Sequence, residues 1–571
     1  MIPPHALAGA LTLLSLVSGQ PHGGSPTHYE LSAEMDGDRI TALDVTIRLD
    51  ADASGRTVID WADQWAGEEH LGQWARDVSV EGARRTEAAP HGGRIVDSAP
   101  GAPLVMRYRI VSAQQAAPDV SNSRQPDPIV RPDWFYAVGF SLYAQPAGRE
   151  ALPATFAWRG PHGIGFASDA QHPQGLMHQP RTGKDIRESV AIGGRDLRVS
   201  TLRLGDDRLR VASIGHFGFD MSDFARLAEK VIASERAFWG DAHAGPFLIT
   251  AVSLASAPKQ TGFSGTGLGD AFATWIGQDT PLPDLAWFLA HEYFHSWNPR
   301  QLGHTEDATE ARTYWISEGF TDFFARRLML RAGLLSPEQF VEEWNEALAR
   351  YARSPYRTSP NAVVADRFWK DERARMMPYQ RGALLAAVWD RRLRQRSGGR
   401  TRLDDVLQDQ RRRAQADPAL GLQDALVAAA AHDGLDLRPD LSRYVDHAAP
   451  VLLPDDAFGE CARVVSVDTP VFDRGWDTEA TTRQGDVVTG LDPTSMAYAA
   501  GLREGMKLLS QSGGNPADPQ VEITLVAQDA SGQHRIRFRP VGRETVRLQH
   551  IALDAARFSA RPEACRQALA G

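Results

Sequence analysis

A pair of histidines flanking a glutamate is the strongest chemical signal in the sequence. Residues 285–298 read LAWFLAHEYFHSWN, so His291, Glu292 and His295 form a His-Glu-x-x-His motif within a helical apolar pattern. Residues four apart on a helix have Cβ atoms about 5–6 Å from each other, so both imidazoles can bind one zinc ion. Glu292 is offset around the helix and can act as the general base on an attacking water. The motif predicts a catalytic zinc site.

A site of this kind needs a third protein ligand, and the downstream sequence offers candidates. A metzincin would have Gly and His three and six residues after the second histidine, but those positions are Asn298 and Gln301. Glu318 stands at the start of an amphipathic segment that continues to about residue 331, and a rigid element suits a metal ligand. The rival carboxylates, which lie in a polar connection, are Glu306, Asp307 and Glu310. We predict that Glu318 is the third ligand.

Asp322 follows Glu318 by one helical turn. A carboxylate at this position can accept the free N–H of a ligand imidazole and so fix the orientation of the ring. The predicted cofactor is therefore one Zn²⁺ ion held by His291, His295 and Glu318, with a fourth position left for water.

Length and composition restrict the class of protein. The chain has 571 residues, which suggests about three domains at roughly 100–200 residues each. Its hydrophobic content of 42% and charged content of 23% are typical of a globular protein. The net charge is −10, and no Lys/Arg run with interleaved aromatic residues is present, which argues against nucleic acid as a partner. No apolar stretch reaches the ~20 residues of a membrane span.

The N-terminus predicts export. Residues 6–17 form an apolar run of signal-peptide length, so residues 1–19 are assigned to a signal peptide and the mature chain to the periplasm or the extracellular space. Because residues 1–5 contain no Lys or Arg, a buried N-terminal segment of a cytosolic protein is the alternative. In an oxidising compartment Cys461 and Cys565 could form a disulfide, or they could be unrelated thiols; their spacing does not decide.

The chain divides into three parts by its patterning. Residues 28–215 show alternating strands, among them 40–49, 104–111 and a hairpin of 197–204 with 209–214. Residues 216–455 begin with a helix over 223–239 capped by Ser222, a strand over 247–255 and a glycine-rich loop over 262–269, and then become mainly helical. Residues 456–571 return to short strands and turns. The pattern predicts a multidomain α+β protein with a sandwich-like N-terminal β domain.

The motifs carry a resemblance to a known family. His291-Glu-x-x-His295-x-Trp297-Asn298, followed by Trp315-x-x-Glu318-Gly319-x-Thr321, resembles the glycyl aminopeptidase family of gluzincin metallopeptidases. The resemblance implies an N-terminal β domain, a thermolysin-like catalytic domain over 216–455 and a C-terminal PDZ domain over 456–571. It also implies a peptide or protein substrate.

Residues 377–384, MPYQRGAL, are similar to a Pro-Tyr-x-Lys-Gly stretch of the wider gluzincin aminopeptidase group. The resemblance implies that the Tyr379 hydroxyl donates a hydrogen bond to the oxyanion. The alternative is a tyrosine that only packs at the start of a helix. Arg381 stands where that group has Lys, and we predict that it contacts the substrate.

A departure from the family lies upstream of the zinc motif. The family has a Gly-Gly-Leu-Glu-His stretch whose Glu can hold the free amino group of a substrate, whereas this chain has Gly267-Leu268-Gly269-Asp270. We predict that Gly267 and Asp270 contact substrate, with Asp270 able to pair with an α-ammonium group.

The segment 485–505 resembles the PDZ pattern of strand, turn, short helix and Ala-Gly-Leu. PDZ domains bind extended peptides at a sheet edge, so a peptide ligand at this domain is one possibility and a purely structural role is the other. The predicted function is a zinc peptidase, aminopeptidase-like on small N-terminal residues. The alternatives are an endopeptidase of the same fold and a catalytically weak scaffold that binds peptides through its last domain.

Overall fold

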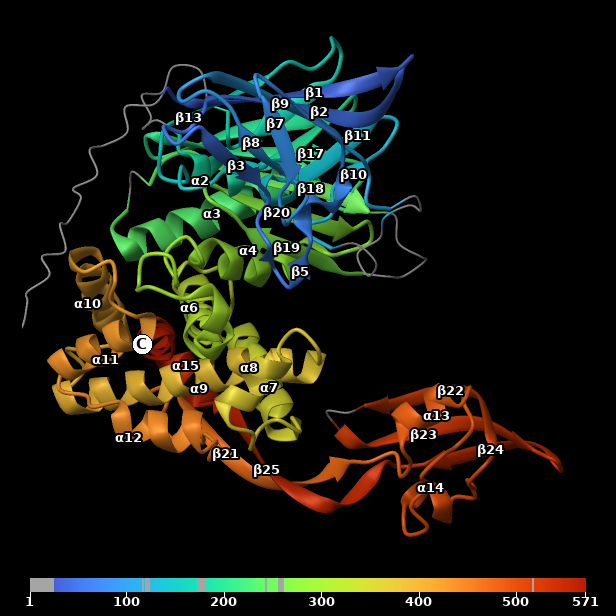
Figure 1. Ribbon diagram of the computed structural model, residues 1–571. Helices are drawn as coiled ribbons and strands as arrows, with labels where there is room; N and C mark the ends of the chain where they lie inside the picture. The colour runs from blue at the N-terminus through green and yellow to red at the C-terminus, as the bar shows by residue number, and fades with distance from the viewer. Residues whose placement is uncertain are drawn as a thin grey trace, which may run out of the picture. The chain divides into compact units, whose positions relative to one another are not determined.

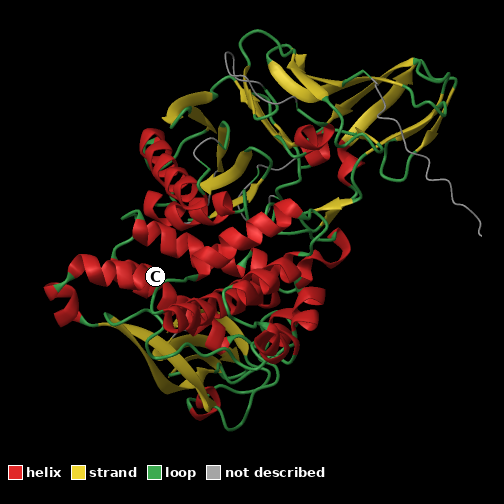
Figure 2. Ribbon diagram, turned by 90° about the vertical axis from the view of Figure 1, so that its left-hand side faces the viewer, coloured by secondary structure: helices red, strands yellow, loops and turns green. Residues whose placement is uncertain are grey.

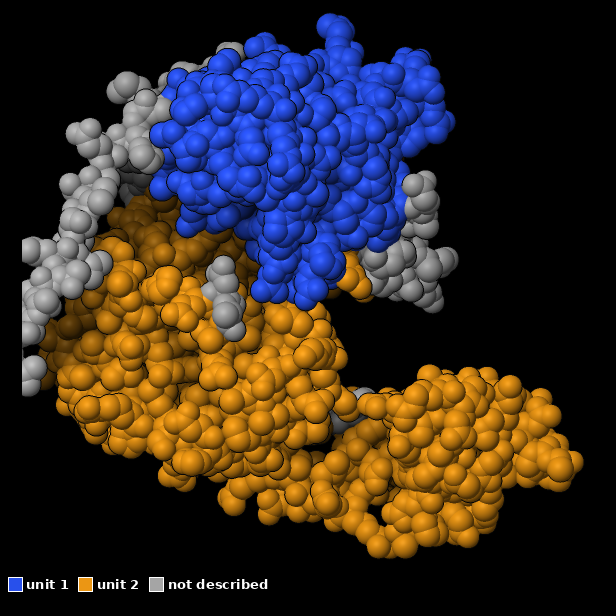
Figure 3. Space-filling model, viewed as in Figure 1, with its two compact units in different colours: residues 1–117, 126–197 blue, residues 118–125, 198–571 orange. Residues whose placement is uncertain are grey.

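The computed structural model describes residues 25–114, 118, 124–171, 181–241, 244–254, 261–515 and 518–571. The predicted signal peptide, residues 1–19, lies outside these residues. The chain forms two compact units, one of residues 1–117 and 126–197 and the other of residues 118–125 and 198–571 (Figure 1 and Figure 3). None of the helices within the described ranges has the length and apolar character of a membrane span.

The first unit is built from strands. Its largest sheet has the order β13-β1-β2-β9-β6, and two four-stranded sheets have the orders β10-β11-β15-β14 and β12-β3-β8-β7. The strands of the largest sheet are β1 (Thr27–Asp36), β2 (Arg39–Asp50), β6 (Ala75–Glu81), β9 (Pro103–Ile110) and β13 (Ala154–Trp158). Those of the other two are β3 (Arg56–Asp60), β7 (Arg85–Ala88), β8 (Arg94–Asp97), β10 (Ile129–Val130), β11 (Trp134–Val138), β12 (Gln145–Pro146), β14 (Gly165–Ser168) and β15 (Val190–Gly194).

Alternating side chains explain why these segments form sheets around one core. Along β1 the residues Tyr29, Leu31 and Ala33 are buried, while the residues between them face outward or are only partly covered. This period of two gives one apolar face, and the apolar faces of the three sheets share one hydrophobic cluster. The predicted strands 40–49 and 104–111 are thus confirmed as β2 and β9.

The second unit begins with a mixed sheet of order β16-β17-β18-β20-β19. Its strands are β16 (Arg198–Leu204), β17 (Asp207–Ile214), β18 (Phe247–Leu254), β19 (Phe263–Gly267) and β20 (Ala271–Gly277). The predicted hairpin is present as β16 and β17, but its assignment to the N-terminal domain was wrong. β17 pairs in parallel with β18 from Leu209↔Phe247 to Ile214↔Val252, so the hairpin belongs to the sheet of the second unit. Local pattern predicts a hairpin but does not say which sheet it joins.

The glycine-rich segment 262–269 was predicted as a loop, and this was also wrong for its central part. Residues Phe263–Gly267 form β19, an edge strand antiparallel to β20. A Cβ on Gly265 would approach the rings of Phe272 and Phe288 to 2.7 Å, so glycine is needed here for close packing rather than for a turn. The segment is therefore a strand whose backbone packs against the neighbouring helix.

Helices are the main type of regular secondary structure in the second unit, and Figure 2 shows the helices of the chain in red. α3 (Met221–Trp239) begins at Asp220, whose side chain accepts the N–H of Ser222, so the cap is Asp220 and not Ser222 as predicted. The helices that surround the predicted site are α4 (Leu285–Phe294), α5 (Tyr314–Ser317), α6 (Gly319–Arg331) and α9 (Glu372–Ser397). The other helices are α7 (Pro337–Arg353), α8 (Asn361–Arg367), α10 (Leu403–Ala416), α11 (Leu422–His432) and α12 (Arg438–Asp440). One hydrophobic cluster runs through the sheet and these helices.

The C-terminal part of the second unit is a ribbon with a small lobe. β21 (Ala462–Phe472) and β25 (Val541–Leu553) pair antiparallel, and the lobe between them contains α13 (Thr478–Arg483), α14 (Met496–Ala499) and the sheet β22-β23-β24 (Figure 1). The sheet strands are β22 (Lys507–Asn515), β23 (Asp518–Asp529) and β24 (Gly532–Phe538). After α15 (Ala555–Ala560), α16 (Pro562–Ala570) returns to α6, and Cys461 and Cys565 form a disulfide. The pairing that their spacing left open is therefore present.

Candidate metal centre

Helix α4 places the first half of the zinc motif. Leu285, Phe288 and Leu289 are buried on this helix and hold it against the sheet and α6. His291 and Glu292 lie in the last turn, and His295 follows as the C-terminal cap with right-handed helical angles. The helical repeat thus continues through His295, so the two histidines lie one turn apart as predicted.

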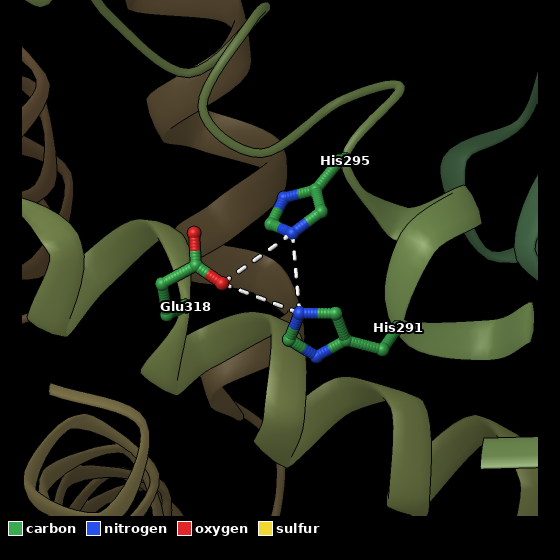
Figure 4. A group of neighbouring side chains, drawn as sticks. All are labelled: His291, His295 and Glu318. Atoms are coloured by element: carbon green, nitrogen blue, oxygen red, sulfur yellow. Dashed lines mark hydrogen bonds and ion pairs between the residues drawn. The ribbon is translucent and has the colours of Figure 1, made fainter. Parts of the chain in front are cut away.

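The third predicted ligand meets the histidines from a second helical segment. Glu318 joins α5 to α6, and its Oε2 lies 3.2 Å from Nε2 of His291 and 3.5 Å from Nε2 of His295 (Figure 4). The two Nε2 atoms are 3.2 Å from each other. These three side chains are the one group among the described residues in which three metal-binding atoms converge.

The outer nitrogens of both rings are already engaged. Nδ1 of His291 lies 3.0 Å from Oδ1 of Asp322, and Nδ1 of His295 lies 2.8 Å from the carbonyl oxygen of Asn298. Since both of these partners are acceptors, each Nδ1 is the donor, and each Nε2 is left with its lone pair when the ring is neutral. Asp322 therefore occupies the position predicted for it and orients the ring of His291.

The convergence of these atoms fits a zinc ion. Ligands about 2.0–2.1 Å from a tetrahedral zinc lie about 3.3–3.4 Å from each other, and the three separations observed are 3.2, 3.2 and 3.5 Å. Two lone pairs and a carboxylate that face one another at this spacing need a cation or protons between them. The donor set of two imidazoles and one carboxylate is one that zinc prefers.

The electrostatics of the three side chains are strongly coupled. Burial lowers the pKa of His291, but the hydrogen bonds to Asp322 and Glu318 outweigh it and raise that pKa to about 10. Burial raises the pKa of Glu318, but the charges and hydrogen bonds of His295 and His291 outweigh it and lower that pKa below the usual value. Without a metal the group therefore holds protons, and binding a cation there must release them.

Glu292 lies beside this group without belonging to it. Its Oε2 accepts the N–H of Gly267 at 3.1 Å. Burial raises the pKa of Glu292, while the nearby His291 and His295 lower it less. A carboxylate with a raised pKa next to a metal position suits a general base. Gly267, predicted to contact substrate, is thus the residue that holds this carboxylate in place.

Helix α9 brings Tyr379 to the same place. The rings of Tyr379 and His291 stack with their centroids 5.6 Å apart and 22° between their planes. Burial, followed by the charges of Glu318 and Glu292, raises the pKa of Tyr379 well above its usual value. The hydroxyl therefore stays protonated near neutral pH, and it is hydrogen-bonded to Glu318 at the edge of the ligand group.

Two of the predicted substrate contacts have other surroundings. Arg381 is 1% exposed, and its Nη2 donates to the carbonyl oxygen of Ser359 at 2.8 Å, so it holds a loop and does not reach a substrate as predicted. Arg381 follows Tyr379 by two positions on one helix, and such residues point in different directions. Asp270 lies between β19 and β20. The pKa of Tyr293 on α4 is raised mainly by burial and, to a smaller extent, by the charges of Glu235 and Asp270. The predicted pairing of Asp270 with the α-ammonium group of a substrate stays a prediction.

Two residues near the ligands, Asn298 and Arg326, have structural roles that were not predicted from the sequence. Asn298 is 0% exposed, and its side-chain amide donates to the carbonyl oxygens of Ile316 and Ser317, which fixes the chain just before Glu318. Arg326 lies 3.2 Å from the Oδ2 of Asp322 and holds that carboxylate from its far side. The i,i+4 spacing of Asp322 and Arg326 was the available signal for the second contact.

Comparison with known proteins agrees with this geometry. Residues 284–384, which contain the complete group, match the family model described as M61 glycyl aminopeptidase. This match supports a gluzincin peptidase. This peptidase matches none of the curated proteins by sequence.

Solved structures show the fold of the peptidase. An aminopeptidase N family protein from Idiomarina loihiensis matches it with a TM-score of 0.70 and 14% identity, over 95% of this chain and 100% of that chain. An M1 zinc metallopeptidase from Deinococcus radiodurans matches with a TM-score of 0.48 and 16% identity, over 76% of this chain and 96% of that one. The first match shows that the peptidase has a multidomain aminopeptidase N-like fold.

Proposed function

We propose that this peptidase hydrolyses peptide bonds at one zinc ion held by His291, His295 and Glu318. The observation that carries the proposal is the convergence of the three ligand atoms within 4.8 Å of one another, with Glu292 and Tyr379 beside them. When bound, a zinc ion supplies Lewis-acid chemistry: it polarises a carbonyl and makes water more acidic.

The chain's own residues would carry out the proton transfers. Glu292, positioned by the N–H of Gly267, accepts a proton from the attacking water and afterwards delivers it to the leaving amine. Tyr379 donates a hydrogen bond to the oxygen on which negative charge develops. Asp322 keeps the ring of His291 in the orientation in which Nε2 faces the metal position.

The proposed substrate is a peptide with a small N-terminal residue. Support comes from the M61 glycyl aminopeptidase match over residues 284–384. An endopeptidase of the same fold is the second candidate, because position 269 is Gly where the family's amine-binding Glu is expected. We further propose that the chain is exported, since the Cys461–Cys565 disulfide is typical of an oxidising compartment, and that the C-terminal lobe is PDZ-like and able to bind a peptide.

A mixed fluorogenic peptide library tests the proposal. Cleavage that stops when a chelator removes metal and returns when zinc is added would support a zinc peptidase. Mass spectrometry of the products separates removal of N-terminal residues from internal cuts. Binding of peptides without any cleavage by the zinc-loaded protein would overturn the proposal in favour of a scaffold.

A further inference from the structure

Two arginines near the base of the C-terminal ribbon, the buried Arg381 and the half-buried Arg357, have no carboxylate counterion among the described residues. Arg381 is 1% exposed, and its Nη2 donates to the backbone carbonyls of Tyr356, Arg357 and Ser359. Its side chain is also hydrogen-bonded to Tyr351, which is neutral. Arg357 donates to the carbonyl of Ala352. The Nε atoms of both guanidinium groups are buried and have no hydrogen-bond partner. Within the described part of the chain, neither group forms an ion pair with a carboxylate.

Elsewhere this protein pairs its buried arginines with carboxylates. Arg327, equally buried, lies 2.6 Å from Asp390 and 2.5 Å from Asp404. Carbonyl oxygens accept hydrogen bonds but do not cancel a positive charge, and a buried charge without a counterion is costly. Arg381 is therefore an exception among the buried arginines of the described residues, and a group of this kind calls for a missing ion or ligand. The half-buried Arg357 beside it also lacks a carboxylate partner.

A cavity lies next to Arg357. Its volume is about 220 Å³, and it is bounded by α7, residues 450–452 and β25. Arg357 lines one side and the exposed Arg547 of β25 lines another, while the remaining wall is largely apolar, from Leu348, Tyr351, Val451 and Val546. Arg547 also has no carboxylate partner among the described residues. The cavity thus offers two cations beside an apolar surface and is open to solvent.

We propose that this cavity binds a carboxylate attached to an apolar group, and specifically the C-terminal residue of a peptide that ends in an apolar side chain. A guanidinium matches a carboxylate with two parallel hydrogen bonds, so Arg357 and Arg547 would hold the charged end. The apolar wall would cover the side chain. A peptide is the favoured source of this carboxylate because every substrate and product of a peptidase contains one, and in this respect the inference rests on the proposed function. A free alkyl carboxylic acid shares the chemistry and is separated from the peptide by the test.

The site differs from the metal centre in its residues. It contains none of His291, His295, Glu318 or Glu292, so binding there does not require hydrolysis. A failure of the proposed function would appear as zinc-loaded protein that cleaves nothing. If the present inference fails, the protein will either not bind the carboxylate outside the metal centre or bind it equally well without Arg547.

Isothermal titration of the full chain loaded with zinc tests the inference, with N-acetyl-L-leucine as the probe. We expect N-acetyl-L-leucine to bind saturably at one site in addition to any binding at the metal. N-acetyl-L-leucinamide should bind the wild-type protein at least tenfold more weakly than the acid does. The acid should bind Arg547→Gln at least tenfold more weakly than it binds the wild type. Arg543→Gln, an exposed arginine of β25 that does not line the cavity, is the matched control and should bind as the wild type does.

Three results would overturn the inference. The first is equal binding of the acid and the amide, which would show that the carboxylate is not recognised. The second is binding that Arg547→Gln leaves unchanged but His295→Ala abolishes, which would place the ligand at the metal centre. The third is tighter binding of octanoate than of N-acetyl-L-leucine, which would assign the cavity to alkyl acids rather than to peptide termini. Since Arg547 is exposed, its substitution is expected to leave the fold intact.

Discussion

Helix α6 contributes to two buried polar clusters that follow opposite designs. The metal cluster consists of His291, His295, Glu318 and Asp322, and the ion-pair cluster consists of Arg327, Asp390, Arg394 and Asp404. In the ion-pair cluster Asp390 accepts from Arg327 at 2.6 Å, from Arg394 at 2.9 Å and from the N–H of Leu403 at 3.1 Å. Cations and carboxylates alternate, and each charge has a partner in the chain.

The metal cluster lacks this balance. Its inner atoms are two imidazole nitrogens and a carboxylate oxygen, all of which are acceptors when the rings are neutral. Its outer atoms are well paired, because Asp322 and Asn298 hold the Nδ1 atoms. The ion-pair cluster, in which every charge has a partner, stabilises the fold. The metal cluster has rigidly held acceptors without donors at its centre, and this arrangement is suited to binding a cation. The predictions below separate these two designs.

The largest effect is expected for His295→Ala. This change removes one of three metal ligands, so zinc should be lost and peptidase activity should fall to background. Metal content by atomic absorption and turnover of a fluorogenic peptide check the result. His534→Ala, which removes a histidine of the C-terminal lobe paired with Asp529, is the control and should retain zinc. Full zinc retention by His295→Ala would remove this residue from the site.

Glu292→Gln should lower turnover by about 10²–10⁴-fold while zinc stays bound. The amide has the same shape and can still accept the N–H of Gly267, but it cannot take up a proton. Single-turnover kinetics together with metal analysis check this outcome. Wild-type rates in the variant would show that another group is the base.

Asp390→Asn should destabilise the fold by about 3–5 kcal/mol without affecting zinc, because it leaves Arg327 with a weakened partner in the core. Urea unfolding of the metal-free protein measures the change. Glu346→Gln, which breaks the exposed pair of Glu346 with Arg350, should cost no more than about 0.5 kcal/mol. A loss of zinc affinity in Asp390→Asn would mean that the two clusters are not independent.

Tyr379→Phe should lower turnover by about 10²–10³-fold through loss of one hydrogen-bond donor to the oxyanion. The ring that stacks on His291 remains, so zinc content should not change. Tyr498→Phe, at a partly exposed tyrosine of α14, is the control. Unchanged kinetics in Tyr379→Phe would exclude a role for the hydroxyl in the reaction.

The smallest effect concerns pH. The charges of Arg327 and Arg394 outweigh burial and lower the pKa of Asp390 from 3.8 to about 2. A carboxylate whose pKa is lower in the folded state stabilises the fold above its unfolded pKa, and this contribution is lost as the pH falls. The free energy of unfolding should therefore drop by about 2 kcal/mol between about pH 4 and pH 2. If the free energy of unfolding of Asp390→Asn drops by the same amount over this pH range, groups other than Asp390 cause the pH dependence.

The sequence predicted each half of the metal cluster well because the information for each half is local. His291 and His295 are brought together by the helical repeat alone, and Glu318 and Asp322 are likewise one turn apart. The ion-pair cluster could not be predicted, since Arg327 and Asp390 are 63 positions apart and come from different helices. The role of Arg381 was mispredicted for the same reason, because its direction depends on how α9 packs.

The sequence by itself determined which residues can bind zinc and which can act as base, because residue type and helical spacing decide that chemistry. Only the tertiary structure decided that Glu318 meets the two histidines and that Cys461 pairs with Cys565. It also decided that residues 198–214 belong to the second unit and that residues 263–267 form an edge strand beside Glu292. Each of these depends on contacts between segments far apart in the chain, and such contacts arise from the burial of apolar faces, whose partners a local pattern does not specify.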